Sequence, residues 1–313
     1  MGINYIVLIN VVLNPCGIVT VLYLSYLFQS WYMRKAFAGE DAAVGERLVY
    51  AFAIEVTGRS CGIAYFISYV AIVLGGKAPH FPPIDKQDWL LAVAAATIAF
   101  AIVETFVALV QERADRFNLV LFLLRALVST TTVWLIVSGM ISREETGWQY
   151  YAWIAGLSVL GLLQWELNAA LARRITSFAM AEMLVPVSVA VSLALTIAGD
   201  AKHGLLAAAI GACAGTIMVA SWFSPDAPLA RGLVTVSSPL LYALVLCGRY
   251  YADAPLLLCA FLVAAPLGGW IAELPPIKRL RPWQSGVIRL LFVAVLTGAA
   301  VAIANAPKDS GEE

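Results

Sequence analysis

Long apolar runs dominate the chain, and short polar or Pro/Gly-rich stretches separate them. A helix needs about 20 mostly apolar residues to cross the hydrocarbon core of a bilayer. On that scale the pattern predicts ten transmembrane helices, at 4–33, 47–75, 89–112, 118–141, 148–172, 177–198, 203–223, 231–248, 254–273 and 284–305. The seventh to ninth runs are the shortest, so nine spans is the alternative. The predicted fold is an all-α, polytopic transmembrane helix bundle.

The composition agrees with this interpretation. Of the 313 residues, 61% are hydrophobic and 13% are charged, whereas soluble domains carry about 25% charged residues. No long polar segment interrupts the apolar runs, so we expect a single helical domain over 1–305 and a short acidic tail over 306–313. The lipid bilayer is the expected partner, and the net charge of zero gives no reason to expect nucleic acid.

Basic residues are distributed unevenly between alternate predicted loops. The odd-numbered loops hold Arg34, Lys35, Arg47, Arg113, Arg116, Arg173, Arg174, Arg231, Lys278, Arg279 and Arg281. The even-numbered loops and the tail hold Lys77, Lys86, Arg143, Lys202, Arg249 and Lys308. Because cytoplasmic loops are enriched in Lys and Arg, the odd loops are predicted to be cytoplasmic and both termini to lie outside, in an inner or plasma membrane.

Seven ionisable residues fall inside the predicted spans: Glu55, Arg59, Glu104, Arg125, Glu166, Glu182 and Arg289. Counted from the cytoplasmic boundary, six of them lie about 10–14 Å deep and Arg59 lies about 18 Å deep. A charge at the centre of a span costs about 2.5–3.5 kcal/mol. We therefore expect most of these side chains to face the interior of the bundle, near the cytoplasm, and to form ion pairs there.

Two pairings follow from spacing alone. Glu55 and Arg59 are four residues apart with the acid first, which is the favourable order for a pair on one helix. Glu104 and Arg125 lie at matched depth on consecutive spans, so they are expected to meet across a hairpin. The alternative is that these pairs are structural, and that Arg125 instead extends its long side chain to the interface.

Glu166 and Glu182 lie at matched depth on the hairpin of the fifth and sixth spans. If they face each other, one must hold a proton or both must share a cation. The whole layer has four acids and three bases, and an unbalanced carboxylate is what a proton- or cation-coupled carrier needs. A purely structural role is the alternative here too.

Small residues and prolines predict details of the packing. Gly58–Gly62 and Gly211–Gly215 are both G-x-x-x-G patterns, which favour the close approach of another helix. Pro186, Pro239 and Pro266 are expected at kinks or at the ends of spans.

The residues also argue against several chemistries. No span contains a lysine to anchor retinal, and His80 and His203 both fall in loops. No zinc-protease, Walker A or nucleophile-elbow motif occurs, so we expect no metal and no cofactor. The five cysteines lack metal-type spacing and are expected to be packing residues, with a Cys247–Cys259 disulfide as the alternative.

Three functions follow as hypotheses. The first is a small-molecule or ion carrier with a cytoplasm-facing polar cavity, in which Glu166 and Glu182 couple transport and Arg125 or Arg59 contacts an anionic group. The second is a non-catalytic scaffold or sensor subunit that docks other membrane subunits through a small-residue face such as Gly211–Gly215. The third is an enzyme acting on lipid headgroups near the basic loop 275–283.

Overall fold

The computed structural model describes residues 9–37, 42–73, 89–110, 114–141 and 147–306. Throughout these ranges the regular structure is helical, which confirms the predicted all-α fold. The elements are η1 (Ile9–Leu13), α2 (Asn14–Ala36), α3 (Ala42–Ile72), α4 (Leu90–Val110), α5 (Ala114–Ile141), α6 (Trp148–Ala172), α7 (Ser177–Ile197), α8 (Ala201–Phe223), α9 (Leu229–Tyr251), α10 (Leu256–Ala264), η4 (Ala265–Glu273), α11 (Pro275–Lys278) and α12 (Pro282–Asn305). The predicted tail 306–313, apart from Ala306, lies outside the described residues, as do His80, Lys77, Lys86, Arg113, Arg143 and Lys308.

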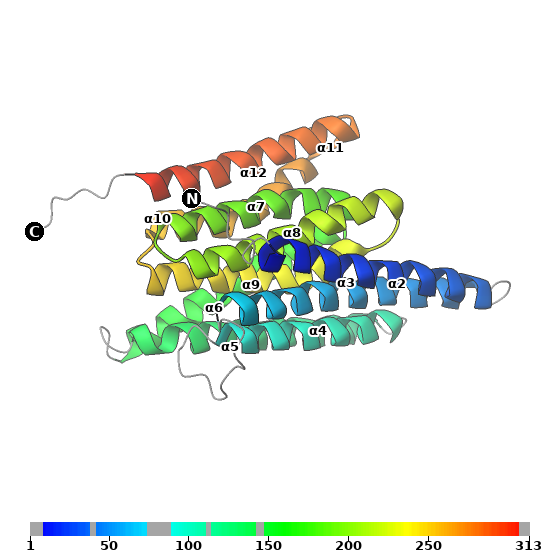
Figure 1. Cartoon of the computed structure of the whole chain (residues 1–313), viewed down its shortest axis with the longest axis horizontal. Helices are drawn as coiled ribbons and strands as arrows, with labels where there is room; N and C mark the ends of the chain where they lie inside the picture. Colours follow the sequence, from blue (N-terminus) through cyan, green and yellow to red (C-terminus); the bar gives the residue numbers. More distant parts are fainter. Residues whose placement is uncertain (1–8, 38–41, 74–88, 111–113, 142–146, 307–313) are drawn as a thin grey trace, which may run out of the picture.

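Nine helices in the described ranges are long and apolar enough to cross a membrane. Helix α3 is not one of them, although its 31 residues make it the longest, because it carries Glu46, Arg47, Glu55 and Arg59. It runs beside α2, and the α2–α3 hairpin extends past the other helices at one end of the bundle (Figure 1). The nine apolar helices indicate an integral membrane protein, and one of them is α10 continued by η4.

Most helix boundaries fall within a few residues of the predicted spans, and the important difference lies at α9. This helix begins at Leu229, two residues before the predicted span 231–248, so Arg231, which the charge count placed with the odd loops, lies within its first turn. Pro228 is its N-cap residue, so the chain enters the helix directly after the proline. The charge of Arg231 is consequently carried into the bundle rather than left at its edge.

Helix α9 is the central helix of the bundle (Figure 1). Within its apolar stretch, 94% of the residues are buried. The helix packs against α3 to α8 and α10. By contrast, α2 and α12 lie at the periphery, and only 22% of the residues in the apolar stretch of each helix are buried. A central helix shielded from lipid on all sides can carry polar residues at low cost, and α9 does so.

Close contact between α3 and α9 depends on glycine. A Cβ atom added to Gly232 would lie 2.3 Å from the carbonyl oxygen of Ile54. One added to Gly58 would lie 2.6 Å from the Cβ atom of Ala101 on α4. The predicted role of Gly58–Gly62 in helix approach is confirmed.

The second G-x-x-x-G pattern has a different setting from the one the scaffold hypothesis expects. Gly211 is buried, and a Cβ atom there would lie 3.2 Å from Cβ of Ser188 on α7. A Cβ atom added to Gly215 would have no other atom within 4 Å. The expected docking face is therefore partly used inside the bundle, because α7 and α8 pack tightly together.

Three prolines lie within the long helical elements. Pro186 and Pro239 lie inside α7 and α9, where each removes one backbone hydrogen-bond donor. Pro266 lies in the first turn of η4, where the α-helical geometry of α10 changes to a 3₁₀ helix.

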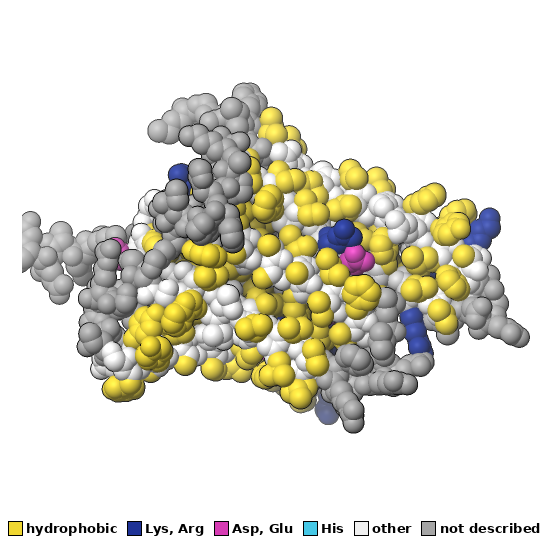
Figure 2. Space-filling model, turned by 90° about the horizontal axis from the view of Figure 1, so that it is seen from below, with side chains coloured by type: hydrophobic (Ala, Val, Ile, Leu, Met, Phe, Trp, Pro, Cys, Tyr) yellow, Lys and Arg dark blue, Asp and Glu magenta, His cyan; other side chains and the backbone are white. Residues whose placement is uncertain are grey.

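The outer surface is predominantly apolar. Hydrophobic side chains cover most of the face shown in Figure 2, and one adjacent basic and acidic pair stands near its middle. Phe106, Leu127 and Val295 are each more than 60% exposed. Such extensive apolar exposure is unusual for a soluble protein and is the surface expected in contact with a lipid bilayer.

Candidate functional site

Arg125 of α5 is the centre of a buried charge cluster. Its side chain is 2% exposed, and its Nη2 lies 3.3 Å from Oε1 of Glu104 on α4. Its Nη1 donates a 2.9 Å hydrogen bond to Oε2 of Glu166 on α6. The predicted Glu104–Arg125 pair across the α4–α5 hairpin is confirmed, and Glu166 joins it as a second acceptor.

Aromatic rings close this cluster on one side. The Arg125 guanidinium carbon lies 5.5 Å from the ring centre of Phe100 and 5.8 Å from that of Trp165. A cation over an aromatic face is attracted by the negative face of the ring. The expected open polar cavity is therefore not formed around Arg125 and Glu104, because mutual neutralisation and aromatic packing seal both side chains.

Arg231 of α9 reaches the same carboxylate from the other side. Its Nη2 lies 3.5 Å from Oε1 of Glu104, and its Nη1 donates a 2.8 Å hydrogen bond to the hydroxyl of Tyr50 on α3. The Thr235 hydroxyl also donates to Glu104. Glu104 is thus the acceptor shared by two guanidiniums and one hydroxyl.

The sequence carried a signal for Arg231 that the loop assignment concealed. Arg231, Thr235, Ser238 and Tyr242 follow one another at intervals of four, three and four residues. That spacing places all four on one face of a helix. A polar stripe within an otherwise apolar span is the pattern that indicates an inward-facing site.

Arg173, at the C-cap of α6, adds a third positive charge to the region. Partial burial and the neighbouring guanidiniums of Arg231 and Arg125 lower the pKa of Arg173, while Glu104 and Glu166 oppose this change. The ion-paired groups are two guanidiniums and two carboxylates. Arg173 is exposed and belongs to none of the ion pairs in the described residues, so it adds a positive charge beside the cluster. The excess of carboxylate expected from the sequence is therefore not present here.

Glu182 belongs to a different neighbourhood from Glu166. Its principal charged neighbour is Arg289 of α12, which also interacts with Glu273 of η4. Glu273 in turn accepts a 3.0 Å bond from Lys278. The expected facing pair of acids is wrong: α7 presents Glu182 to α12, whereas α6 presents Glu166 to α5.

Glu55 and Arg59 form the predicted pair on α3, with a 2.7 Å contact between Oε1 and Nη1. Their side chains are 22% and 49% exposed, so the pair lies at the surface and not in an inner layer. It neutralises itself locally, which removes the need for partners from other helices.

No family model, curated protein or solved structure matches this chain. The function is therefore argued from the geometry of the charge cluster and its surroundings.

Polar groups continue inward from the cluster along the α6–α9 interface. Asn168 donates a 3.2 Å hydrogen bond to the Ser238 hydroxyl, while its own Oδ1 has no protein partner. Gln164 Oε1, Trp165 Nε1 and Ser237 Oγ are likewise buried without protein partners. Buried polar atoms are nearly always satisfied, commonly by internal water. This interface therefore has the polarity that a hydrated path requires.

The cysteines act as packing residues. All five are free thiols, and Cys61, Cys213, Cys247 and Cys259 are buried. The alternative disulfide between Cys247 and Cys259 is therefore not formed. Within the described residues no three His, Cys, Asp or Glu side chains gather as metal ligands.

Proposed function

We propose that this protein is a membrane carrier for a small anionic solute that binds at the net positive cluster formed by Arg125, Arg173 and Arg231. The observation supporting this proposal is that two guanidiniums, Arg125 and Arg231, share the Glu104 carboxylate while a third, Arg173, is exposed beside them. An oxyanion of the solute supplies the missing negative charge. Guanidinium groups suit this task because they bind carboxylate or phosphate through two parallel hydrogen bonds.

Of the two guanidiniums that share Glu104, Arg231 is the better placed to meet the solute. Its side chain is 12% exposed, whereas Arg125 and Glu104 are almost sealed. Its contact with Glu104 is 3.5 Å, longer than the roughly 2.7–2.9 Å of a strong charge-assisted hydrogen bond. Arg231 therefore retains capacity to bind a further oxyanion.

Glu166 is the group that we expect the solute to displace. It holds Arg125 through one 2.9 Å contact, and its side chain is 27% exposed. Its second oxygen, Oε1, has no protein partner. A solute anion that takes its place on Arg125 releases Glu166 to accept a proton, so anion entry and protonation are linked.

The polar interface between α6 and α9 offers the onward route. Beyond Thr235, the side chains of Asn168, Ser237 and Ser238 line the buried side of these helices. The unpartnered oxygen atoms of Asn168 and Ser237 supply acceptors for water or for a protonated solute. Movement of α6 against the central α9 opens this route in the proposed mechanism.

The test measures anion binding first and transport second. Thermal unfolding of the purified protein in nanodiscs is followed with phosphate, acetate and succinate at constant ionic strength, with choline as the cationic comparison. A ligand at 100 times its Kd adds about 2.7 kcal/mol of stability. We expect at least one anion to raise the Tm, and the combined Arg173→Gln and Arg231→Gln variant to lose this rise.

The matched control is Arg279→Gln, which removes an exposed guanidinium from the same end of the bundle. A stabilising anion is then used for counterflow in proteoliposomes. Stabilisation without counterflow contradicts the carrier and favours the sensor hypothesis. Stabilisation lost equally in Arg279→Gln, or found with no anion, contradicts the binding site itself.

A further inference from the structure

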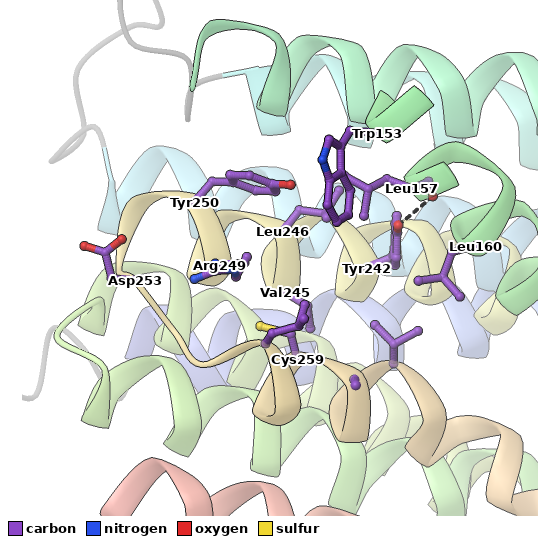
Figure 3. A pocket seen from close by; sticks show the side chains of 13 residues that line it. Trp153, Leu157, Leu160, Tyr242, Val245, Leu246, Arg249, Tyr250, Asp253 and Cys259 are labelled. Atoms are coloured by element: carbon purple, nitrogen blue, oxygen red, sulfur yellow. Dashed lines mark hydrogen bonds between the residues drawn. The ribbon is translucent and has the colours of Figure 1, made fainter. Parts of the chain in front are cut away.

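A cavity of about 560 Å³ lies between α6, α9 and α10, at the opposite end of the bundle from the Arg125 cluster (Figure 3). Its lining comes from the first half of α6, the last three turns of α9 and the whole length of α10. This volume is within the range of roughly 300–1,000 Å³ typical of small-molecule sites. None of the residues in the charge cluster lines it.

Divergence of α6 and α10 creates the cavity. Both helices pack on α9, but α10 also packs against α12, whereas α6 packs mainly against α5. The connection between α9 and α10 is fixed by Arg249, whose Nη1 donates a 3.2 Å hydrogen bond to the carbonyl of Ala254. At this end α6 and α10 are therefore held against different neighbours, and a space remains between them.

The cavity is an apolar groove that opens sideways. Val245 of α9 forms part of its floor, and Leu160 and Val263 contribute to its walls on α6 and α10. Trp153 and Leu256, also in the lining, are 48% and 66% exposed. In a membrane-spanning bundle such a lateral opening faces acyl chains and not water.

The inner end of the groove is closed by Tyr242. Its hydroxyl donates a 2.6 Å hydrogen bond to the carbonyl of Leu157, as Figure 3 shows. A Cβ atom at Gly161 would lie 2.6 Å from the tyrosine ring. Glycine at this position lets the ring lie flat against α6 and seal the groove.

A guanidinium stands at the outer end. Arg249 is in the last turn of α9, seven residues beyond Tyr242, which corresponds to about 10 Å along the helix. Its bond to Ala254 uses one of five N–H donors. None of the ion pairs in the described part of the chain includes Arg249, and Asp253 lies at the rim, to the side of it in Figure 3.

We propose that this groove binds a phospholipid, with its phosphate on Arg249 and one acyl chain lying along Val245 toward Tyr242. The proposal matches each part of the site to one part of the ligand. A guanidinium at the helix end lies at headgroup level and pairs with phosphate. The apolar trough below it opens to the hydrocarbon layer, from which an acyl chain enters.

The apolar length of the groove separates this ligand from a soluble anion. Inorganic phosphate would satisfy Arg249 but would leave the apolar walls without contacts. A neutral apolar molecule would fill the trough but would gain nothing from the guanidinium. A phospholipid uses both features at once, and the bilayer presents it at high local concentration.

Photo-crosslinking tests the proposal directly. The full chain is placed in nanodiscs that contain phosphatidylglycerol with a diazirine in its acyl chain, and crosslinked peptides are mapped by mass spectrometry. We expect crosslinks to concentrate on the groove segments of α6 and α10. Arg249→Gln should reduce them about tenfold, because a hydrogen bond to a charged group is lost. Ala260→Trp, which fills the groove without changing charge, should abolish them.

The control variant is Lys202→Gln, which removes a cation from the same end of the bundle but outside the groove. Arg249→Lys preserves the charge and should retain most of the crosslinking even if Arg249→Gln folds poorly. Crosslinks spread evenly over the lipid-facing helices overturn the proposal. So does groove crosslinking unaffected by Arg249→Gln, since it would show a site for apolar chains alone. The absence of any acyl-chain crosslinking in the groove would overturn it as well.

Discussion

The Arg231 guanidinium lies 3.5 Å from the Glu104 carboxylate, although 127 positions separate the two residues in the chain. The same carboxylate oxygen receives Arg125 at 3.3 Å. One buried acid therefore joins the central helix α9 to the α4–α5 hairpin. Its removal would leave two guanidiniums without their shared counterion.

We predict that Glu104→Gln destabilises the protein by about 3–5 kcal/mol, the usual cost of breaking a buried ion pair from one side. Glutamine keeps the shape of the side chain, so the effect reports charge and not volume. Arg125 is then held by Glu166 alone, and Arg231 by Tyr50. The thermal unfolding midpoint of the purified variant in nanodiscs provides the measurement.

Glu55→Gln is the comparison variant for this prediction. It removes an acid from the exposed pair on α3, where the loss should be smaller because the long side chain of Arg59 is 49% exposed and can extend to the interface. Equal destabilisation by Glu104→Gln and Glu55→Gln would show that the buried cluster has no special part in stability.

Local spacing was sufficient to predict the pairs formed within one helix or one hairpin. Glu55–Arg59 follows from a separation of four residues, and Glu104–Arg125 from equal depth on consecutive spans. Neither argument needs knowledge of how distant helices are arranged. The helical architecture was predictable for the same reason, because hydrophobic length alone identifies a span.

Depth gives the level of a residue in the bundle but not the direction in which its side chain points. Glu166 and Glu182 lie at similar levels, yet one faces Arg125 and the other faces Arg289. Rotation about each helix axis is decided by packing between spans distant in sequence. Arg231 was missed because its depth was assigned from a helix boundary placed two residues too late.

The α3–α9 crossing yields a second prediction. Gly232→Ala places a methyl group 2.3 Å from the Ile54 carbonyl oxygen, so the helices must move apart. Overpacking of this kind costs about 1–3 kcal/mol, and separation of α3 from α9 also disturbs the Arg231–Tyr50 bond. We expect a lower Tm and weaker anion binding. Gly156→Ala, at a position with open space, should leave both unchanged.

The turn before α8 gives a pH-dependent prediction. Asp200 caps α8 by accepting a 3.3 Å bond from the backbone N–H of His203, and its second oxygen contacts the His203 ring. Burial alone would raise the pKa of Asp200, but the bonds from His203 and the charge of Lys202 outweigh burial and lower it. The folded state therefore favours the ionised carboxylate.

Because the folded pKa lies below the ordinary value of 3.8, this stabilisation is complete above that pH and is lost as the pH falls through the folded pKa. Asp200→Asn keeps the helix cap but removes the charge. The Tm difference between wild type and Asp200→Asn should shrink as the pH falls below about 4 toward pH 3. Asp226→Asn, in the exposed α8–α9 turn, should show no such change. A pH-independent difference for Asp200→Asn would contradict the role of its charge.

The distribution of basic residues predicts which end of the bundle faces the cytoplasm, and cysteine labelling tests it. Cys16 is the one native thiol that is not buried, so the Cys16→Ala variant should show little labelling of its own. Lys202→Cys then places a thiol at the even-loop end and Arg279→Cys places one at the odd-loop end, both at exposed positions. A membrane-impermeant maleimide added to intact cells should label Lys202→Cys, and should label Arg279→Cys only after permeabilisation.

This labelling pattern is expected from the preference for Lys and Arg on the cytoplasmic side. It would put Arg173 and Arg231 within reach of cytoplasmic solutes, and Arg249 at the outer leaflet. The reverse labelling would invert both assignments, because the two sites lie at opposite ends of the same central helix.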